Sequence, residues 1–286
     1  MELDAPDVLG DVPAAAAAGW VIVGGGVAAS LAVAWLIARR IRRGLPAVPP
    51  RPHPQAPWSG GDVVATTLSF LGFQVLAAAA VPPTASLQLR LAAGAGAMLA
   101  ATGVSMLQLM LRGCGRGALG CGLGHLGADL RLAVGGLALL LAPLLGLAAI
   151  LDRIVPYRHA IVDFLKAHHD VSSVALVVFA AVVAAPIAEE FLFRRVLQGW
   201  LERRLDGGAI RGGGGLAVGL SSLAFALAHV GQGLAWVPLF FFGLVVGHLA
   251  RQTGSIVPGV ILHALFNAVS VGLVLLQVAE PAAGGG

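Results

Sequence analysis

Residues 184–195 read AAPIAEEFLFRR and place two adjacent acids at the end of a long apolar run. This stretch continues an uncharged apolar run that begins at Val171 and is long enough to cross most of a bilayer. Two adjacent carboxylates, Glu189 and Glu190, therefore fall at the edge of the hydrocarbon or inside it. A charge in the middle of a membrane helix costs about 2.5–3.5 kcal/mol on insertion scales, so it is retained where function or a partner requires it. The polar partners of these two glutamates must come from other parts of the chain.

Composition places the chain among helical membrane proteins. Hydrophobic residues make up 58% of it, charged residues only 11%, and mean hydropathy is +0.88, whereas soluble domains carry about 25% charged residues. The pI near 10.0 does not indicate nucleic-acid binding. The basic residues lie in short clusters beside apolar spans, and no basic groove or known reader motif is present. We predict an all-α, polytopic integral membrane protein.

Apolar runs predict about eight transmembrane helices. They cover, in chain order, residues 14–38, 62–81, 87–111, 132–154, 171–203, 216–230, 234–250 and 256–278. A short interfacial helix is expected within residues 155–170, and the Pro-rich linker 44–58 is expected to be extended and mobile. We divide the chain into an N-terminal anchor helix with this linker, residues 1–60, and a helical domain, residues 61–280, that carries the motifs.

The distribution of Lys and Arg predicts the orientation. With both termini outside, one side of the membrane keeps only four of the 18 basic residues, namely Arg90, Arg153, Arg158 and Lys166. The other 14 gather on the opposite side, which the positive-inside rule identifies as cytoplasmic. We therefore expect a protein of the cell membrane with its N-terminus and C-terminus outside.

Helical geometry separates the roles of the two glutamates. Arg194 follows Glu190 by four residues, so these side chains can pair along one face and support the helix. Glu189 lies about 100° around the helix and is free to face the protein interior. Pro186 removes one backbone hydrogen bond and can kink or open the helix just before the pair. The alternative is that both glutamates pair with Arg194 and Arg195 at the inner interface.

Three further polar side chains fall within apolar spans. His229 lies in the sixth span, and His263 and Asn267 lie in the eighth at an i, i+4 spacing that puts them on one face. One intramembrane histidine is more often a packing residue than a catalyst, but two histidines, an amide and a free glutamate on three spans indicate a site. Helix counting gives inner-side depths of about 9 Å for Glu189, about 10 Å for His263 and about 15–20 Å for His229.

These residues carry a resemblance to a known family. Glu189-Glu190-x-x-x-Arg194, Phe225-x-x-x-His229 and His263-x-x-x-Asn267 resemble the three motifs of the CAAX prenyl endopeptidase and bacteriocin-processing (Abi, CPBP) family of intramembrane proteases. The connecting Gly243-x-x-x-Gly247 is similar as well. The resemblance covers residues 180–268 and keeps the order of the motifs. The first half of the chain is similar only in being a set of apolar spans, and the linker is not part of the shared pattern.

The resemblance implies an intramembrane endopeptidase that acts on a membrane-tethered protein or peptide, with a site open toward the cytoplasm. Glu189 would act as general base on a water that His229 helps to hold, and His263 and Asn267 would stabilise the oxyanion. A metal is the alternative, since Glu189, His229 and His263 match the two-His, one-carboxylate set of a catalytic zinc. There is, however, no His-Glu-x-x-His helix, and asparagine is an uncommon zinc ligand. The balance slightly favours a metal-free water.

Two other classes of function compete with a protease. A catalytically silent immunity or scaffold protein of the same fold would keep the spans without the chemistry, although all motif residues are intact. A proton-coupled transporter would use Glu189 and the histidines as a relay, but no internal repeat is visible. A serine protease built on Ser221 or Ser222 lacks the Gly-x-Ser-x-Gly elbow.

The remaining candidate ligands indicate no second site. Cys114, Cys121 and His125 form a loose pattern whose spacing matches no familiar zinc module. The other histidines are assigned to the linker, the outer loop and the inner end of the seventh span: His53, His159, His168, His169 and His248.

Overall fold

The computed structural model describes residues 14–156, 160–168, 170–206 and 212–279, and these form helices and no strands. The expected all-α membrane fold is confirmed, because six described helices are long and apolar enough to cross a bilayer. Arg158, His159, His169, Arg211 and both chain ends lie outside the described residues. The elements are α1 (Ala14–Arg42), α2 (Gly60–Ala80), α3 (Leu87–Leu111), η1 (Arg116–Leu119), α4 (Leu126–Asp152), α5 (Ala160–Ala167), α6 (Val171–Val178), η2 (Phe179–Ala184), α7 (Ala185–Glu189), η3 (Glu190–Gln198), α8 (Gly199–Leu205), α9 (Gly213–Leu227), α10 (Trp236–Thr253) and α11 (Val257–Ala279).

The expected spans correspond to these helices one by one. Five of the six candidate spans are α1 from Gly24, α2, α3, α4 and α11 to Leu276, and the sixth is the continuous helix Val171–Leu205 that α6 to α8 form together. The other two expected spans are the shorter α9, of 15 residues, and α10, of 18 residues. The count of eight crossings stays a prediction.

Capping residues explain where the second span begins. The Ser59 hydroxyl accepts a hydrogen bond from the Asp62 N–H, and the Asp62 carboxylate accepts one from the Ser59 N–H. This reciprocal capping box satisfies two of the N–H groups that a helix start leaves unpaired. The helix ends at Ala80, just before Pro82 and Pro83, which cannot continue the backbone ladder.

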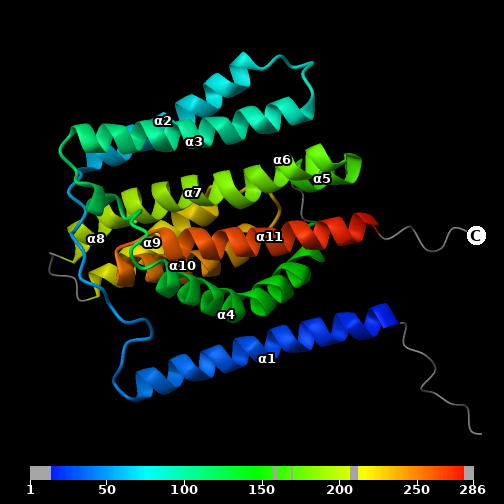
Figure 1. Ribbon diagram of the computed structural model, residues 1–286, viewed down its shortest axis with the longest axis horizontal. Coiled ribbons are helices and arrows are strands. Elements are labelled where there is room, and N and C mark those ends of the chain that lie inside the picture. The colour runs from blue at the N-terminus through cyan, green and yellow to red at the C-terminus, as the bar shows by residue number, and fades with distance from the viewer. Residues whose placement is uncertain (1–13, 157–159, 169, 207–211, 280–286) are drawn as a thin grey trace, which may run out of the picture.

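The helices form a layered bundle with the helix Val171–Leu205, which carries both glutamates and is called the motif helix, near its middle (Figure 1). The pair α2 and α3 lies on one side, and α1 lies on the opposite side against α4. Ser30 of α1 donates a hydrogen bond of 2.7 Å to the carbonyl of Ala138 in α4. Helices α9, α10 and α11 pack around the helix Val171–Leu205. The site residues therefore lie in the part of the bundle that is covered on several sides.

The Pro-rich linker 44–58 differs from the mobile segment that the sequence predicted, because several contacts anchor it. Arg51 forms a 2.6 Å ion pair with the buried Asp129 at the start of α4. Trp58 is 2% exposed and donates from Nε1 to the carbonyl of Val196 at 2.9 Å. Arg203 of α8 donates to the carbonyl of Pro57 at 2.8 Å. The linker is thus attached across the end of the motif helix, and residues 44–58 are called the strap.

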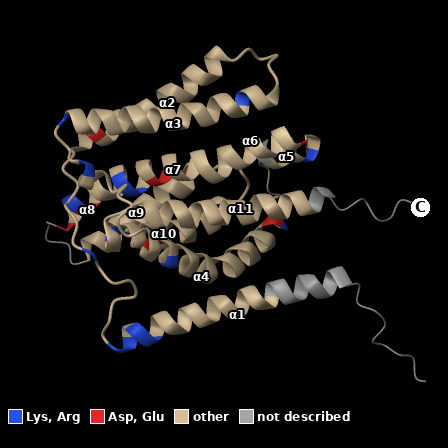
Figure 2. Cartoon of the chain, viewed as in Figure 1, with Lys and Arg blue, Asp and Glu red and all other residues tan. Residues whose placement is uncertain are grey.

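Charged side chains are unevenly distributed along the bundle. Lys and Arg gather mainly at the end where α1 finishes and α2 begins, while the opposite end carries few (Figure 2). This is the asymmetry on which the predicted orientation rests. The assignment of that end to the cytoplasm stays a prediction.

The motif helix begins at a strong cap, which gives a prediction about pH. The Asp170 carboxylate accepts bonds from the backbone N–H and the hydroxyl of both Ser172 and Ser173, and these hold the pKa of Asp170 below its ordinary range. A lowered carboxyl pKa stabilises the fold above the ordinary value near 4, and this contribution is lost as pH falls through the lowered pKa. We expect Asp170→Ala to lower the Tm at pH 7, and the difference from wild type to shrink below about pH 4.

Melting curves of both proteins from pH 3 to 8 check this. Asp163→Ala is the control, because Asp163 is an exposed acid on the neighbouring α5. A Tm difference that is constant over the whole range would contradict the cap.

Candidate active site

The motif helix is not a regular α-helix. Its residues 179–184 and 190–198 are π-helical, and only the short α7 between them is α-helical. Pro186, at the second position of α7, has no N–H, and its ring crowds the carbonyl four residues earlier, so the turn before it widens. Single π-helical turns are rare and occur often at functional sites. The sequence predicted an opened helix at Pro186, and the structure gives it this form.

Glu190 is the buried anchor of the site. Its Oε2 lies 3.4 Å from Nε of Arg194, and both side chains are 0% exposed. Arg194 also donates to the Ser221 hydroxyl at 3.3 Å, and its guanidinium lies 4.9 Å above the Phe225 ring. The i, i+4 pairing expected from the sequence is therefore present, and it is held inside the bundle.

Arg195 does not join this pair at an interface. It donates through Nε to the carbonyl of Ala118, and its guanidinium lies 5.1 Å from the ring centre of Trp58. The alternative expectation, in which both glutamates pair with both arginines, is therefore wrong. Glu189 instead faces two histidines.

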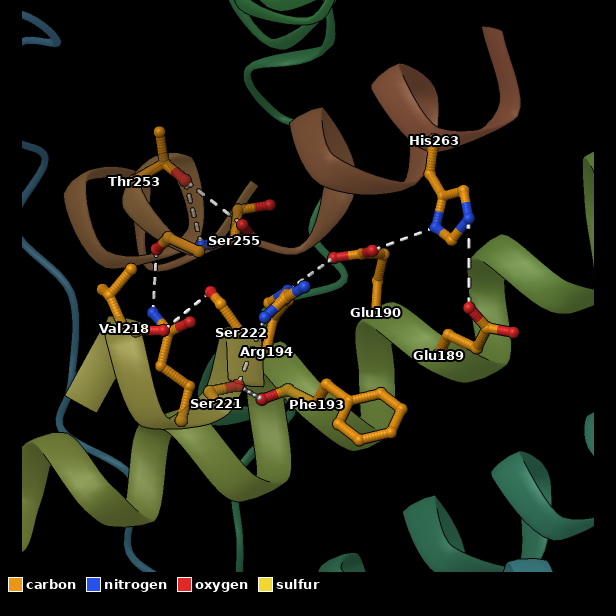
Figure 3. Close-up of polar contacts among 12 residues, drawn as sticks. Glu189, Glu190, Phe193, Arg194, Val218, Ser221, Ser222, Thr253, Ser255 and His263 are labelled. Carbon is orange, nitrogen blue, oxygen red and sulfur yellow. Dashed lines mark hydrogen bonds and ion pairs between the residues drawn. The ribbon is translucent and has the colours of Figure 1, made fainter. Parts of the chain in front are cut away.

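His263 connects the two glutamates (Figure 3). Its Nδ1 lies 3.0 Å from Oε1 of Glu190, and its Nε2 lies 3.9 Å from Oε2 of Glu189. The side chain is 6% exposed and makes edge contacts with the rings of Phe242 and Phe225. The buried Glu190 thus orients the ring so that the second nitrogen is directed at Glu189.

His229 approaches Glu189 from the other side. Its Nδ1 lies 2.9 Å from the carbonyl oxygen of Phe225, and its Nε2 lies 4.0 Å from Oε2 of Glu189. A carbonyl can only accept, so Nδ1 carries the proton and the neutral ring presents a bare Nε2 to Glu189. The same reasoning applies to a neutral His263 beside the ionised Glu190. Separations of 3.9 and 4.0 Å are too long for direct hydrogen bonds and suit a bridging water.

Glu189, His229 and His263 meet in the structure although helix counting gave His229 a greater depth. The motif helix continues to Leu205, so Glu189 lies 16 residues, or about 24 Å, from that end. His229 follows the end of α9 and lies 16 residues after its start at Gly213, which is again about 24 Å along a helix. His263 lies only six residues, or about 9 Å, after the start of α11 at Val257, so distances along the helices do not by themselves explain how the three side chains meet.

Asn267 takes a different position from the one expected. It shares a face of α11 with His263, as its spacing predicts, but its Nδ2 donates to the backbone carbonyl of Ala181 at 2.7 Å. Ala181 belongs to the π-helical segment before Pro186. The amide nitrogen is thus already engaged within the motif helix.

Two supporting residues, Phe225 and Gly259, have roles that the sequence did not indicate. Phe225 is 0% exposed, and its ring centre lies 4.9 Å from that of His229 and 5.9 Å from that of His263. Its place four residues before His229 is the only signal that indicated it. Gly259 lies so close to Glu190 that a Cβ there would be 3.1 Å from Oε2. Only a glycine allows α11 to approach the buried carboxylate in this way.

The described side chains do not form a metal site. No group of three His, Cys, Asp or Glu residues among them gathers in an arrangement that could hold a metal ion. The two imidazole nitrogens and the carboxylate oxygen of Glu189 are separated as they would be around a bridging water, and Glu189 Oε2 has no hydrogen-bond partner in the described chain. The set has the composition of a catalytic zinc site, but its side chains are not gathered as metal ligands here, so we derive the chemistry from the protein groups alone.

Comparisons with known proteins agree with the motif pattern. Neither the curated proteins nor the solved structures contain a match to this chain. A family model does match, and its range includes Glu189, His229, His263 and Asn267. Residues 171–269 match the model of the family described as type II CAAX prenyl endopeptidase, Rce1-like, which confirms the resemblance predicted from the motifs.

Proposed function

We propose that this protein is an intramembrane endopeptidase that hydrolyses a peptide bond of a membrane-associated protein or peptide. The observation that carries the proposal is the position of Glu189, whose Oε2 lies within 4.0 Å of Nε2 of His229 and 3.9 Å of Nε2 of His263. A carboxylate and two imidazoles around one space can orient and deprotonate a water molecule. The family match on residues 171–269 supports a protease of the CAAX type.

In the first step, a water between Glu189 and His229 attacks the carbonyl carbon of the substrate. The water donates one hydrogen to the Glu189 carboxylate and the other to the bare Nε2 of His229, so a lone pair of its oxygen points away from both. Glu189 takes the proton as the new carbon–oxygen bond forms. When the tetrahedral intermediate collapses, Glu189 returns that proton to the leaving amine. General-base catalysis of this kind contributes about 10²- to 10⁴-fold to a rate.

The developing oxyanion is assigned to His263. In its protonated form this ring donates from Nδ1 to Glu190, at 3.0 Å, and has an Nε2–H to offer to the oxyanion. The buried Glu190 keeps the His263 ring in place and is the negatively charged partner of the protonated ring, and Arg194 holds Glu190 through an ion pair. The sequence assigned Asn267 to the oxyanion as well. The 2.7 Å bond to Ala181 engages one of the two amide N–H groups of Asn267, and we assign the oxyanion to His263, whose Nε2 is directed at Glu189.

The proposal includes the orientation of the protein in the membrane. With the Arg-rich end of the bundle in the cytoplasm, the site opens toward that side and the chain resides in the cell membrane with both termini outside. We propose residues 61–280 as the protease domain and residues 1–60 as an anchor helix with its strap. The strap is attached to that domain through Arg51, Trp58 and Pro57.

Hydrolysis by the purified protein in proteoliposomes tests the proposal. The probes are fluorogenic peptides with one membrane anchor, made with and without a prenylated C-terminal cysteine. We expect wild type to cleave at least one of them, and His229→Ala to lower the rate at least about 10²-fold. His125→Ala is the matched control, because His125 is exposed at the start of α4, and it should retain the wild-type rate.

The same assay distinguishes the other readings. A chelator should leave the rate unchanged, and a loss that added zinc restores would replace the metal-free mechanism with a metal-dependent one. Hydrolysis that is equally fast in wild type and His229→Ala would contradict the proposed site. Absence of cleavage would favour the silent scaffold, and a proton flux without cleavage would favour the transporter.

A further inference from the structure

The π-helical turn before Pro186 leaves one backbone carbonyl without a helical partner. A π-helical segment is defined by bonds from an N–H to the carbonyl five residues earlier, and at the end of residues 179–184 such a bond joins the Ala185 N–H to the Ala180 carbonyl. The next bond in this pattern would join Pro186 to Ala181, but proline has no N–H. A carbonyl inside a membrane protein must find another donor, because water is scarce there.

Asn267 supplies that donor from a different helix. Its Nδ2 lies 2.7 Å from the carbonyl oxygen of Ala181. Pro186 is itself buried, and α11 packs against both η2 and α7. The amide therefore occupies the place of the N–H that Pro186 lacks.

The same face of α11 makes a second bond to the motif helix. One turn before Asn267, His263 bonds Glu190 through Nδ1 at 3.0 Å. Glu189 follows Ala181 and precedes Glu190, so it lies between the two points at which α11 is attached. Two bonds from one helix face restrict both the rotation and the axial position of the segment between them.

We propose that Asn267 is a positioning residue: its amide replaces the missing N–H of Pro186 at Ala181 and thereby fixes the direction in which Glu189 points. The hydrogen bond stands on the structure alone, whereas its effect on hydrolysis rests on the proposed function. This role differs from the one that the sequence suggested, in which Asn267 bonds the oxyanion directly.

A double-mutant cycle with Pro186 tests the proposal. Asn267→Ala should lower the Tm by about 2–6 °C, as expected for one lost buried hydrogen bond, and should lower kcat while leaving KM nearly unchanged. Pro186→Ala restores an N–H five residues after Ala181. In that background the losses of Tm and of kcat caused by Asn267→Ala should fall to less than half.

Gln74 provides the matched control. It is also an amide that donates to a backbone carbonyl of another helix, that of Gly94 at 3.3 Å, but it belongs to α2. Gln74→Ala should therefore cause the same loss of Tm with and without Pro186→Ala. Asn267→Asp is a second variant that does not depend on Pro186. It keeps the side-chain size but turns a carboxylate toward the Ala181 carbonyl, so its Tm should fall below that of Asn267→Ala.

The Tm results test the role of Asn267 even if the protein proves not to be a protease. Equal losses of Tm from Asn267→Ala in both backgrounds, or an Asn267→Asp variant as stable as wild type, would overturn the positioning role. So would loss of kcat in both backgrounds without any change of Tm, which would indicate direct catalysis by Asn267. If no reporter is cleaved even by wild type, the Tm cycle still decides whether Asn267 replaces the missing N–H.

Discussion

Glu189→Gln is expected to lower hydrolysis of the membrane-anchored reporters by about 10²- to 10⁴-fold, the range that general-base catalysis supplies. The amide keeps the shape of the side chain and can still hold a water, but it cannot accept a proton. The Glu189 side chain is 19% exposed and makes only long contacts to His229 and His263. Its replacement should therefore leave the fold intact. Single-turnover rates in proteoliposomes, with melting curves of the same samples, check both parts.

Glu190→Gln is the informative comparison for this result. Glu190 is fully buried, forms an ion pair with Arg194 and bonds His263, so its neutralisation removes the paired charge of Arg194. We expect it to lower both the rate and the Tm, whereas Glu189→Gln lowers the rate alone. If Glu189→Gln kept more than a tenth of the wild-type rate, Glu189 would not be the general base.

Arg194→Ala should have the largest effect on stability. Removing one partner of a buried ion pair leaves an uncompensated charge and destabilises a protein by about 3–5 kcal/mol. Here Arg194 and Glu190 are both 0% exposed, and Arg194 also bonds Ser221 and lies over Phe225. Reversible unfolding in denaturing detergent, or the yield of folded protein where unfolding is irreversible, measures the loss.

Two further variants show whether the lost charge partner is the cause. Arg112→Ala removes an arginine that is 59% exposed, and its partner Asp62 keeps its hydrogen bonds from Ser59, so we expect a smaller loss than for Arg194→Ala. Glu190→Gln in the Arg194→Ala background removes the stranded charge and should recover part of the lost stability. Wild-type stability of Arg194→Ala would show that the pair does not hold the motif helix.

Local signals were enough to predict most of the fold. Helix α3 covers Leu87–Leu111 as expected, because Ser86 caps its start and the apolar run defines its length. Helix α4 begins six residues before its expected start at residue 132. Its first turns contain Asp129, which is fully buried and paired with Arg51 of the strap. A polar residue whose partner is far away in sequence looks like a loop residue, so the helix start and the anchored strap were missed together.

The contacts of the candidate site likewise fall into those that the sequence predicts and those that depend on tertiary packing. The pairing of Glu190 with Arg194 follows from i, i+4 geometry and was predictable from the sequence. The bonds of α11 to this helix were not. His263 reaches Glu190 and Asn267 reaches Ala181 because two π-helical stretches alter the rotation of the motif helix around α7. The presence of Pro186 indicated a break in the helix, but the direction of the side chains after it depends on tertiary packing.

In the proposed mechanism, Glu189 and His229 act on one water molecule. The most direct test is kcat/KM for Glu189→Gln, His229→Ala and the double variant on one anchored reporter in the same lipid. Residues that act as a unit are strongly non-additive. We expect the double variant to be slower than the slower single variant by no more than about threefold, because either change alone leaves the water unactivated. Two losses that multiply in the double variant would contradict this mechanism.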